Sequence, residues 1–252
     1  HIQANDIDFV TPRENRVMFS RDIDSLQMVI SQGFAPMITE TEVMLISCFS
    51  EVLEKDILEE RMRQVNELLT ALPENAYVLL EDGCYINKDF RIYVHEALRE
   101  KLHILSMNED EMQEYIGRRI NIMDPEAVLE AVKYMYDKIG IPVLIVHSAA
   151  WAIAYGEGAA KMGHVLEGGV TMAATRFWKG DVFGPEEYEA TANLTPRQDS
   201  IVFGQKLEEL SDREICCVPS KDMSFVEHPV VVGLGDSFAG GILPELTLNK
   251  RG

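Results

Sequence analysis

Short apolar segments alternate with longer amphipathic segments along most of the chain. Residues 43–49 (VMLISCF) are almost entirely apolar, which predicts a buried strand. Residues 53–72 place apolar side chains three and four positions apart, which predicts a helix that Pro73 ends. The alternation continues, with strands expected at 76–82, 101–107 and 141–148 and helices expected at 88–100, from 109 and over 125–140.

The expected strands are continuous apolar runs, which are typical of strands covered by helices on both faces of a sheet. Alternation of such strands with helices favours parallel pairing. We therefore expect an α/β domain with three layers, α/β/α, around a largely parallel central sheet. The later part of the chain predicts a strand at 150–158, a helix over 164–180, strands at 214–220 and 230–233, and a last helix beginning in DSFAGGILPEL (236–246).

The first 25 residues are polar, carry mixed charges and lack the strand–helix alternation. We expect residues 1–25 to be a remnant of a lid or separate lobe, and residues 26–252 to form one domain. Because the chain begins at His1 without a methionine, we also expect that an N-terminal portion is missing from it.

Charge and composition narrow the classes of partner. The chain has 42 acidic and 23 basic residues, a net charge of −19, which repels nucleic acids and anionic membranes. Mean hydropathy is −0.06, and no apolar run approaches the length of a membrane span. The four cysteines have no CxxC spacing, which argues against a zinc site or a disulfide framework. We expect a cytoplasmic protein that binds small molecules.

A glycine-rich segment, VVVGLGDSFAGG (230–241), places Asp236 where the last helix is expected to begin. Its spacing matches neither GxGxxG nor the P-loop, which disfavours a dinucleotide-dependent oxidoreductase. A tight turn before a helix presents free backbone amides to an anion, and a carboxylate there can accept a proton from a hydroxyl that attacks phosphorus. An N-cap role for Asp236, with the glycines serving close helix packing, fits the spacing equally well.

The segment VPSKDMSFVEHPVVVGLGDSFAGG (218–241) resembles the closing segment of ADP-dependent glucokinases and phosphofructokinases, which are ribokinase-like sugar kinases. Three further segments agree with this family in order: TPRENRVMFSRD (11–22), LSMNEDEM (105–112) and VLIVHSAAWAIAYG (143–156). The resemblance implies a ribokinase-like nucleotide-binding and catalytic domain. Members of the family are longer, so the resemblance also implies that an N-terminal part and most of the lid are missing.

The implied activity is Mg²⁺-dependent transfer of a phosphoryl group from ADP to a hexose or hexose phosphate, such as glucose or fructose 6-phosphate. Two other functions fit the same fold. One is an ATP-dependent ribokinase-like kinase. The other is a non-catalytic protein that senses a nucleotide or a sugar.

By this resemblance, Asp236 is the catalytic base, Gly233 and Gly235 contribute to the anion hole, and Leu234 contacts the nucleotide. Asn108 and Glu111 match the family motif NxxE, which organises Mg²⁺, a cation that prefers oxygen ligands. The pair also has the spacing of a capping box that starts a helix. Both roles are compatible.

The resemblance also assigns five residues elsewhere in the chain. Glu81 would support the metal site, or else be a solvated carboxylate. His147 would lie near the nucleotide, or else be a histidine hydrogen-bonded at a sheet edge. Arg197 would contact nucleotide phosphate, or else be a surface charge. Arg13 and Arg16 would reach a substrate phosphate, since guanidinium pairs two oxygens, or else form ion pairs with nearby carboxylates.

Overall fold

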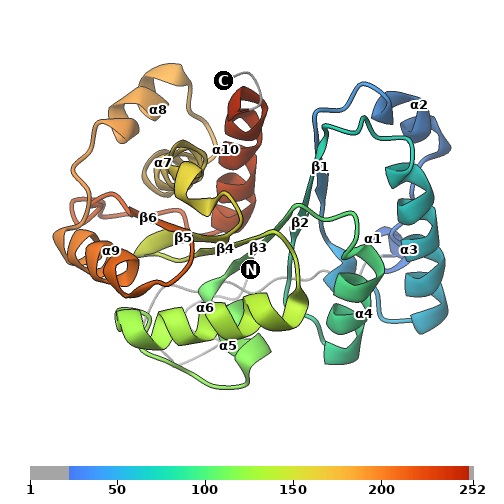
Figure 1. Ribbon diagram of the computed structural model, residues 1–252. Coiled ribbons are helices and arrows are strands. Elements are labelled where there is room, and N and C mark those ends of the chain that lie inside the picture. The colour runs from blue at the N-terminus through green and yellow to red at the C-terminus, as the bar shows by residue number, and fades with distance from the viewer. Residues whose placement is uncertain (1–22, 250–252) are drawn as a thin grey trace, which may run out of the picture.

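The computed structural model describes residues 23–249 (Figure 1). Within this range six strands form one sheet in the order β1 to β6. The strands are β1 (Val43–Ile46), β2 (Tyr77–Glu81), β3 (Ile104–Asn108), β4 (Val143–His147), β5 (Trp151–Gly156) and β6 (Ile215–Pro219). Strands β1 to β4 are parallel, and β5 is antiparallel to both of its neighbours. The prediction of a largely parallel sheet is confirmed.

Strand β5 reverses direction because residues 148–150 are all that join it to β4. A parallel crossover needs a dozen or more residues, so a connection of this length permits only an antiparallel neighbour. Strand β6 then runs in the same direction as β4. As a result, the carboxyl ends of β1 to β4 and of β6 all lie at one edge of the sheet.

Helices cover both faces of the sheet (Figure 1). One face carries α3 (Lys55–Leu69), α4 (Lys88–Leu98), α5 (Glu109–Ile116), α6 (Pro125–Ile139) and α9 (Gln198–Leu210). The other face carries α7 (Gly163–Lys179) and α10 (Leu234–Asn249), with α8 (Pro185–Ala192) beside α7. Short helical segments are α1 (Ile23–Gln27), η1 (Gln32–Phe34), α2 (Ala35–Ile38), η2 (Phe49–Glu51) and η3 (Ala159–Lys161).

Side chains along the inner strands point alternately into two apolar cores. In β4, Leu144 and Val146 belong to the core shared with α3, α4, α5, α6 and α9. Val143 and Ile145 belong to the core shared with α7 and α10. A strand buried on both faces has no polar positions to alternate, which explains the continuous apolar runs in the sequence.

Helices α7 and α10 approach each other closely because glycines line their contact. A Cβ atom on Gly168 would lie 2.7 Å from the carbonyl oxygen of Gly241, and one on Gly169 would lie 2.6 Å from the ring of Phe238. Glycine is unfavourable inside a helix, so its presence here is explained by packing. The structure therefore shows the predicted packing role for Gly241, whereas a Cβ on Gly240 would meet open space.

The prediction of a strand at 230–233 is wrong. The segment is irregular and ends in a turn, with the amide of Val230 donating to the carbonyl of Phe177 in α7 at 3.0 Å. Its β-branched residues lie beside the end of a helix and join no ladder of the sheet. The sequence pattern also predicts no helices where α8 and α9 lie.

The lobe expected at 1–25 falls almost entirely outside the described residues, since α1 begins at Ile23. The division into residues 1–25 and 26–252 stays a prediction. Among the described residues, no helix is both long and apolar enough to cross a membrane.

Candidate active site

Four of the predicted site residues gather at the carboxyl edge of the sheet. Glu81 is the last residue of β2, Asn108 the last of β3 and His147 the last of β4, while Glu111 lies in the first turn of α5. Asn108 and His147 are direct partners in the β3–β4 register. The parallel strands therefore place side chains from distant parts of the sequence next to one another.

Asn108 and Glu111 form a complete capping box. The side-chain oxygen Oδ1 of Asn108 accepts hydrogen bonds from the amides of Asp110 and Glu111, both at 2.9 Å. Oε2 of Glu111 accepts from the amide of Asn108 at 2.9 Å. The local role of this motif is thus to start α5, and the same bonds turn the Glu111 carboxylate back toward the end of β3.

Glu111 is unusual among the acidic residues because its side chain is buried, with the residue 6% exposed. Burial raises the pKa of Glu111 to about 7. The hydrogen bond from the Asn108 amide opposes the rise, and the nearby carboxylates of Asp82 and Glu81 add to it. Glu111 therefore exchanges its proton near neutral pH, and a cation that displaced the proton would relieve the repulsion.

His147 connects Glu81 to the start of α10. Its Nε2 lies 3.2 Å from Oε1 of Glu81, and its ring stacks on Phe238 with centroids 4.3 Å apart. Burial opposes protonation of His147, but the hydrogen bond to Glu81 and the charges of Glu81, Glu111 and Glu109 together outweigh it and raise the pKa of His147. The structure therefore agrees with the alternative prediction for His147, which was a histidine hydrogen-bonded at the sheet edge.

The GLGD segment forms the turn and first residues of α10. Gly233 has a φ of +73°, in the left-handed region that favours glycine, and α10 begins at Leu234. The first intrahelical hydrogen bond is from the amide of Ser237 to the carbonyl of Gly233, at 3.0 Å. The amides of residues 234–236 precede that bond and so lie at the positive end of the helix dipole.

Asp236 is the third residue of α10 and is exposed. The N-cap interpretation is therefore wrong for Asp236, because Gly233 holds that position. An exposed carboxylate at the open end of a helix can meet a hydroxyl group that approaches the amides of the same turn. A Cβ on Gly235 would lie 3.9 Å from Cε1 of His147, so this turn packs directly against the histidine.

Arg176 of α7 contacts the segment that leads into the GLGD turn. The sequence pattern did not indicate this residue. Its Nε donates to the carbonyl of Val232 at 2.7 Å, and its Nη2 lies 2.6 Å from Oδ1 of Asp181. Arg176 and Val232 are 56 positions apart in the sequence. No local pattern links two residues at that separation, so the contact is known only from the structure.

Arg197, the one predicted arginine among the described residues, does not join this group of residues. Arg197 precedes α9, and its Nη2 pairs with Oδ2 of Asp199 at 2.6 Å. Its amide donates to the carbonyl of Ser220 at 2.9 Å, just beyond β6, so it lies at the same edge of the sheet but at a different strand. Arg13 and Arg16 lie outside the described residues.

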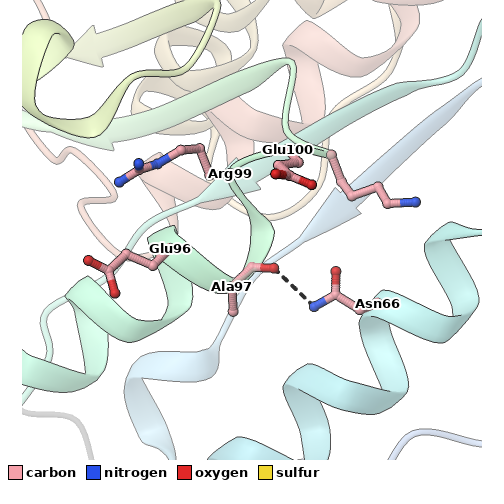
Figure 2. A pocket seen from close by; sticks show the side chains of 6 residues that line it. Asn66, Glu96, Ala97, Arg99 and Glu100 are labelled. Atoms are coloured by element: carbon pink, nitrogen blue, oxygen red, sulfur yellow. Dashed lines mark hydrogen bonds between the residues drawn. The ribbon is translucent and has the colours of Figure 1, made fainter.

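Two surface recesses lie away from these residues. The first, of about 380 Å³, lies between α3 and α4, where Nδ2 of Asn66 donates to the carbonyl of Ala97 at 3.0 Å (Figure 2). The second, of about 290 Å³, adjoins it near Lys101 and His103. Both are lined by residues that lead into β2 or β3, at the amino edge of the sheet. Neither recess includes a predicted site residue.

The oxygen atoms at the carboxyl edge suit a magnesium ion. Oε2 of Glu81 is buried and has no hydrogen-bond partner among the described residues. Residues 23–249 contain no group of three or more histidine, cysteine or acidic side chains placed to hold a metal by themselves. Mg²⁺ usually takes one or two carboxylates together with substrate phosphates and water, so the pair Glu81 and Glu111 fits it.

The conserved region of ADP-specific phosphofructokinases and glucokinases matches residues 4–243. The chain belongs to this family. The resemblance inferred from the sequence is thereby confirmed. No curated protein matches the chain in sequence.

Solved structures are similar to this chain in fold. A phosphofructokinase from Pyrococcus horikoshii OT3 with AMP is 18% identical, with a TM-score of 0.73 over 88% of this chain and 56% of its own. An ADP-dependent kinase in complex with fructose 6-phosphate and ADPβS is 17% identical, with a TM-score of 0.72 over 86% of this chain and 57% of its own. The ribokinase-like α/β/α fold is confirmed. The chain spans a little over half the length of these structures.

Proposed function

We propose that this chain carries the catalytic site of an ADP-dependent sugar kinase. The kinase transfers a phosphoryl group from ADP to a hexose or hexose phosphate in the presence of Mg²⁺. One observation carries the proposal: His147 lies between the two halves of the site, with its Nε2 3.2 Å from Oε1 of Glu81 at the end of β2 and its ring stacked on Phe238 of α10, beside the GLGD turn. Phosphoryl transfer needs both an anion-binding turn with a base and a carboxylate site for a metal.

In this proposal the amides of residues 233–236 stabilise charge on the transferring phosphoryl group. Gly233, with its positive φ, forms the turn from which α10 begins, beside His147 at the carboxyl edge. The amides are fixed before the reaction begins, so they need no reorganisation as charge develops. Asp236, exposed in the same turn, accepts the proton of the attacking sugar hydroxyl.

Glu81 and Glu111 would hold Mg²⁺, which, when bound, neutralises charge on the donor phosphates. Asn108 acts through the capping box, which keeps the Glu111 carboxylate at the strand end. A net charge of −19 repels free nucleotide, so a cation at this edge also serves binding. Glu111 must lose its proton before it can hold the metal.

The remaining roles concern the nucleotide and the sugar. We infer that His147, Leu234 and Arg197 contact the ADP donor, and that Arg13 and Arg16 contact a phosphate of the acceptor. The solved complex with fructose 6-phosphate and ADPβS supports this class of ligands. The composition and the family favour the cytoplasm as the place of action.

The test compares the intact protein with its Asp236→Asn variant. Each is offered ADP or ATP separately, with glucose or fructose 6-phosphate as acceptor, in the presence and absence of Mg²⁺. We expect Mg²⁺-dependent transfer from ADP that falls at least about 100-fold in the variant, while ADP binding is nearly unchanged. Asp56→Asn is the matched control, because it removes an exposed carboxylate from the first turn of α3 on the opposite face of the sheet.

Three results would contradict parts of the proposal. Ordinary turnover by Asp236→Asn would remove Asp236 from the role of base. Transfer from ATP but not from ADP would indicate an ATP-dependent kinase of the same fold. ADP binding without transfer to either acceptor would favour a nucleotide sensor.

A further inference from the structure

A buried ionic cluster lies beside the candidate site, on the side of β2 that faces α4. Asp82 directly follows Glu81, and its side chain is 0% exposed. Nε of Arg91 in α4 lies 3.2 Å from Oδ2 of Asp82, and the Arg91 side chain is 3% exposed. Nε2 of His95, one turn further along α4, lies 3.4 Å from Oδ1 of Asp82. Successive residues of an extended segment point to opposite faces, so Asp82 faces α4 while Glu81 faces α10.

Arg91 links the two elements that carry the proposed metal carboxylates. Its Nη2 donates to the carbonyl of Gly83 at 2.7 Å, two residues after Glu81. The same nitrogen donates to Oε2 of Glu114 at 2.8 Å, and Glu114 lies about one turn after Glu111 on α5. One guanidinium group therefore fastens the end of β2 to α5.

The composition of this cluster is not explained by stability alone. The ion pairs that Asp82 makes with Arg91 and His95 do not have hydrogen-bond geometry, so both oxygens of Asp82, both ring nitrogens of His95 and Nε of Arg91 make no hydrogen bond among the described residues. Buried charges lose their hydration, and well-packed apolar residues of similar volume often stabilise a fold as well or better. What an apolar cluster would lack is the planar fork of arginine, which fixes several acceptors in one geometry.

We propose that Arg91 is a positioning residue that sets the separation of the Glu81 and Glu111 carboxylates. The capping box holds the first turn of α5, and the bond from Arg91 to Glu114 is a second attachment that fixes how the helix is rotated about its axis. This inference rests on the proposed function, since it takes Glu81 and Glu111 as the residues that hold Mg²⁺. Groups that orient metal ligands typically change metal affinity by 10- to 100-fold when they are mutated.

Two variants test the link in the intact protein. Glu114→Gln removes the charge that attaches Arg91 to α5, and the Glu114 side chain is 29% exposed, so no fully buried carboxylate loses its partner. Arg91→Lys keeps the positive charge and removes the fork. The matched control is Glu130→Gln, which breaks the exposed pair between Glu130 and Arg118.

The measurement is Mn²⁺ binding in the presence of ADP, followed by electron paramagnetic resonance of free Mn²⁺, with thermal unfolding recorded for each variant. We expect the dissociation constant for Mn²⁺ to rise about tenfold in Glu114→Gln and Arg91→Lys, and to stay unchanged in Glu130→Gln. The Mg²⁺ concentration for half-maximal turnover should rise in parallel. If Arg91→Lys fails to fold, Glu114→Gln alone decides the question.

A purely structural role predicts a different result. In that case Glu114→Gln would unfold at a lower temperature but would bind Mn²⁺ as tightly as the unmodified protein, which overturns the positioning role. Glu111→Gln separates this failure from failure of the proposed function. If Glu111→Gln weakens Mn²⁺ binding and Glu114→Gln does not, only the role of Arg91 is wrong. If Glu111→Gln also leaves Mn²⁺ binding unchanged, the metal site and the inference that rests on it are both wrong.

Discussion

Replacing Glu111 by glutamine is expected to stabilise the metal-free protein at pH 8 and to change its stability little at pH 4. Folding buries this carboxyl group beside the carboxylates of Asp82 and Glu81. Glutamine has no charge to bury, and its side-chain oxygen can still accept the hydrogen bond from the Asn108 amide. The substitution therefore removes the cost of ionisation while the helix cap is retained.

The size of the effect follows from the pKa of Glu111, which burial raises from an ordinary value of 4.5 to about 7. Because the folded protein holds this proton more tightly than the unfolded chain, the free energy of unfolding falls as pH rises through this range. The fall begins near pH 4.5 and is complete above about pH 7. A pKa difference of one corresponds to about 1.4 kcal/mol, so the full loss is about 3 kcal/mol.

Urea unfolding of the metal-free protein between pH 4 and pH 8 checks this prediction. The difference in unfolding free energy between Glu111→Gln and the unmodified protein should grow with pH and level off at about 3 kcal/mol. Glu126→Gln is the matched control, because Glu126 is an exposed carboxylate in the first turn of α6. A Glu111→Gln variant whose advantage is absent at pH 8, or is equal at all pH values, would refute the reasoning.

Two further predictions concern glycines within α10 or directly before it. Gly233→Ala should lower the free energy of unfolding by about 1–2 kcal/mol in urea and reduce turnover, because Gly233 has a φ of +73° and its new Cβ would lie 3.2 Å from Nε of Arg176. Unchanged turnover would show that the turn tolerates other conformations. Gly241→Ala should destabilise by about 1–3 kcal/mol because the added methyl group meets α7, whereas Gly240→Ala should stabilise by about 0.5–1 kcal/mol. If Gly240→Ala and Gly241→Ala changed the unfolding temperature by the same amount, the close contact of α7 with α10 would be contradicted.

The layered architecture could be predicted from the sequence because it depends on local patterns. A run such as Val143–His147 is apolar at nearly every position, and only a strand covered on both faces needs that composition. Asn108 and Glu111 form their capping box within four residues, so the beginning of α5 was also predictable. The family could be inferred for the same reason, since its motifs are short and occur in order.

The prediction failed where a local pattern fits more than one tertiary environment. Residues 230–232 are β-branched and apolar, as in a strand, but their segment lies beside α7 and joins no sheet. A run of this kind forms a strand only if a neighbouring strand offers it hydrogen bonds. The sequence of the run contains no information about that neighbour.

The sequence by itself determined the sheet layers, the start of α5 and the residue types available for chemistry at the strand ends. Tertiary structure alone decided that His147 contacts both Glu81 and Phe238, that Arg176 holds the GLGD turn, and that Arg91 links β2 to α5. Helix and strand preferences arise within a few residues along the chain. Ion pairs, burial and the pKa shifts they cause depend on which distant segments meet, and that is settled only when the two apolar cores pack against the sheet.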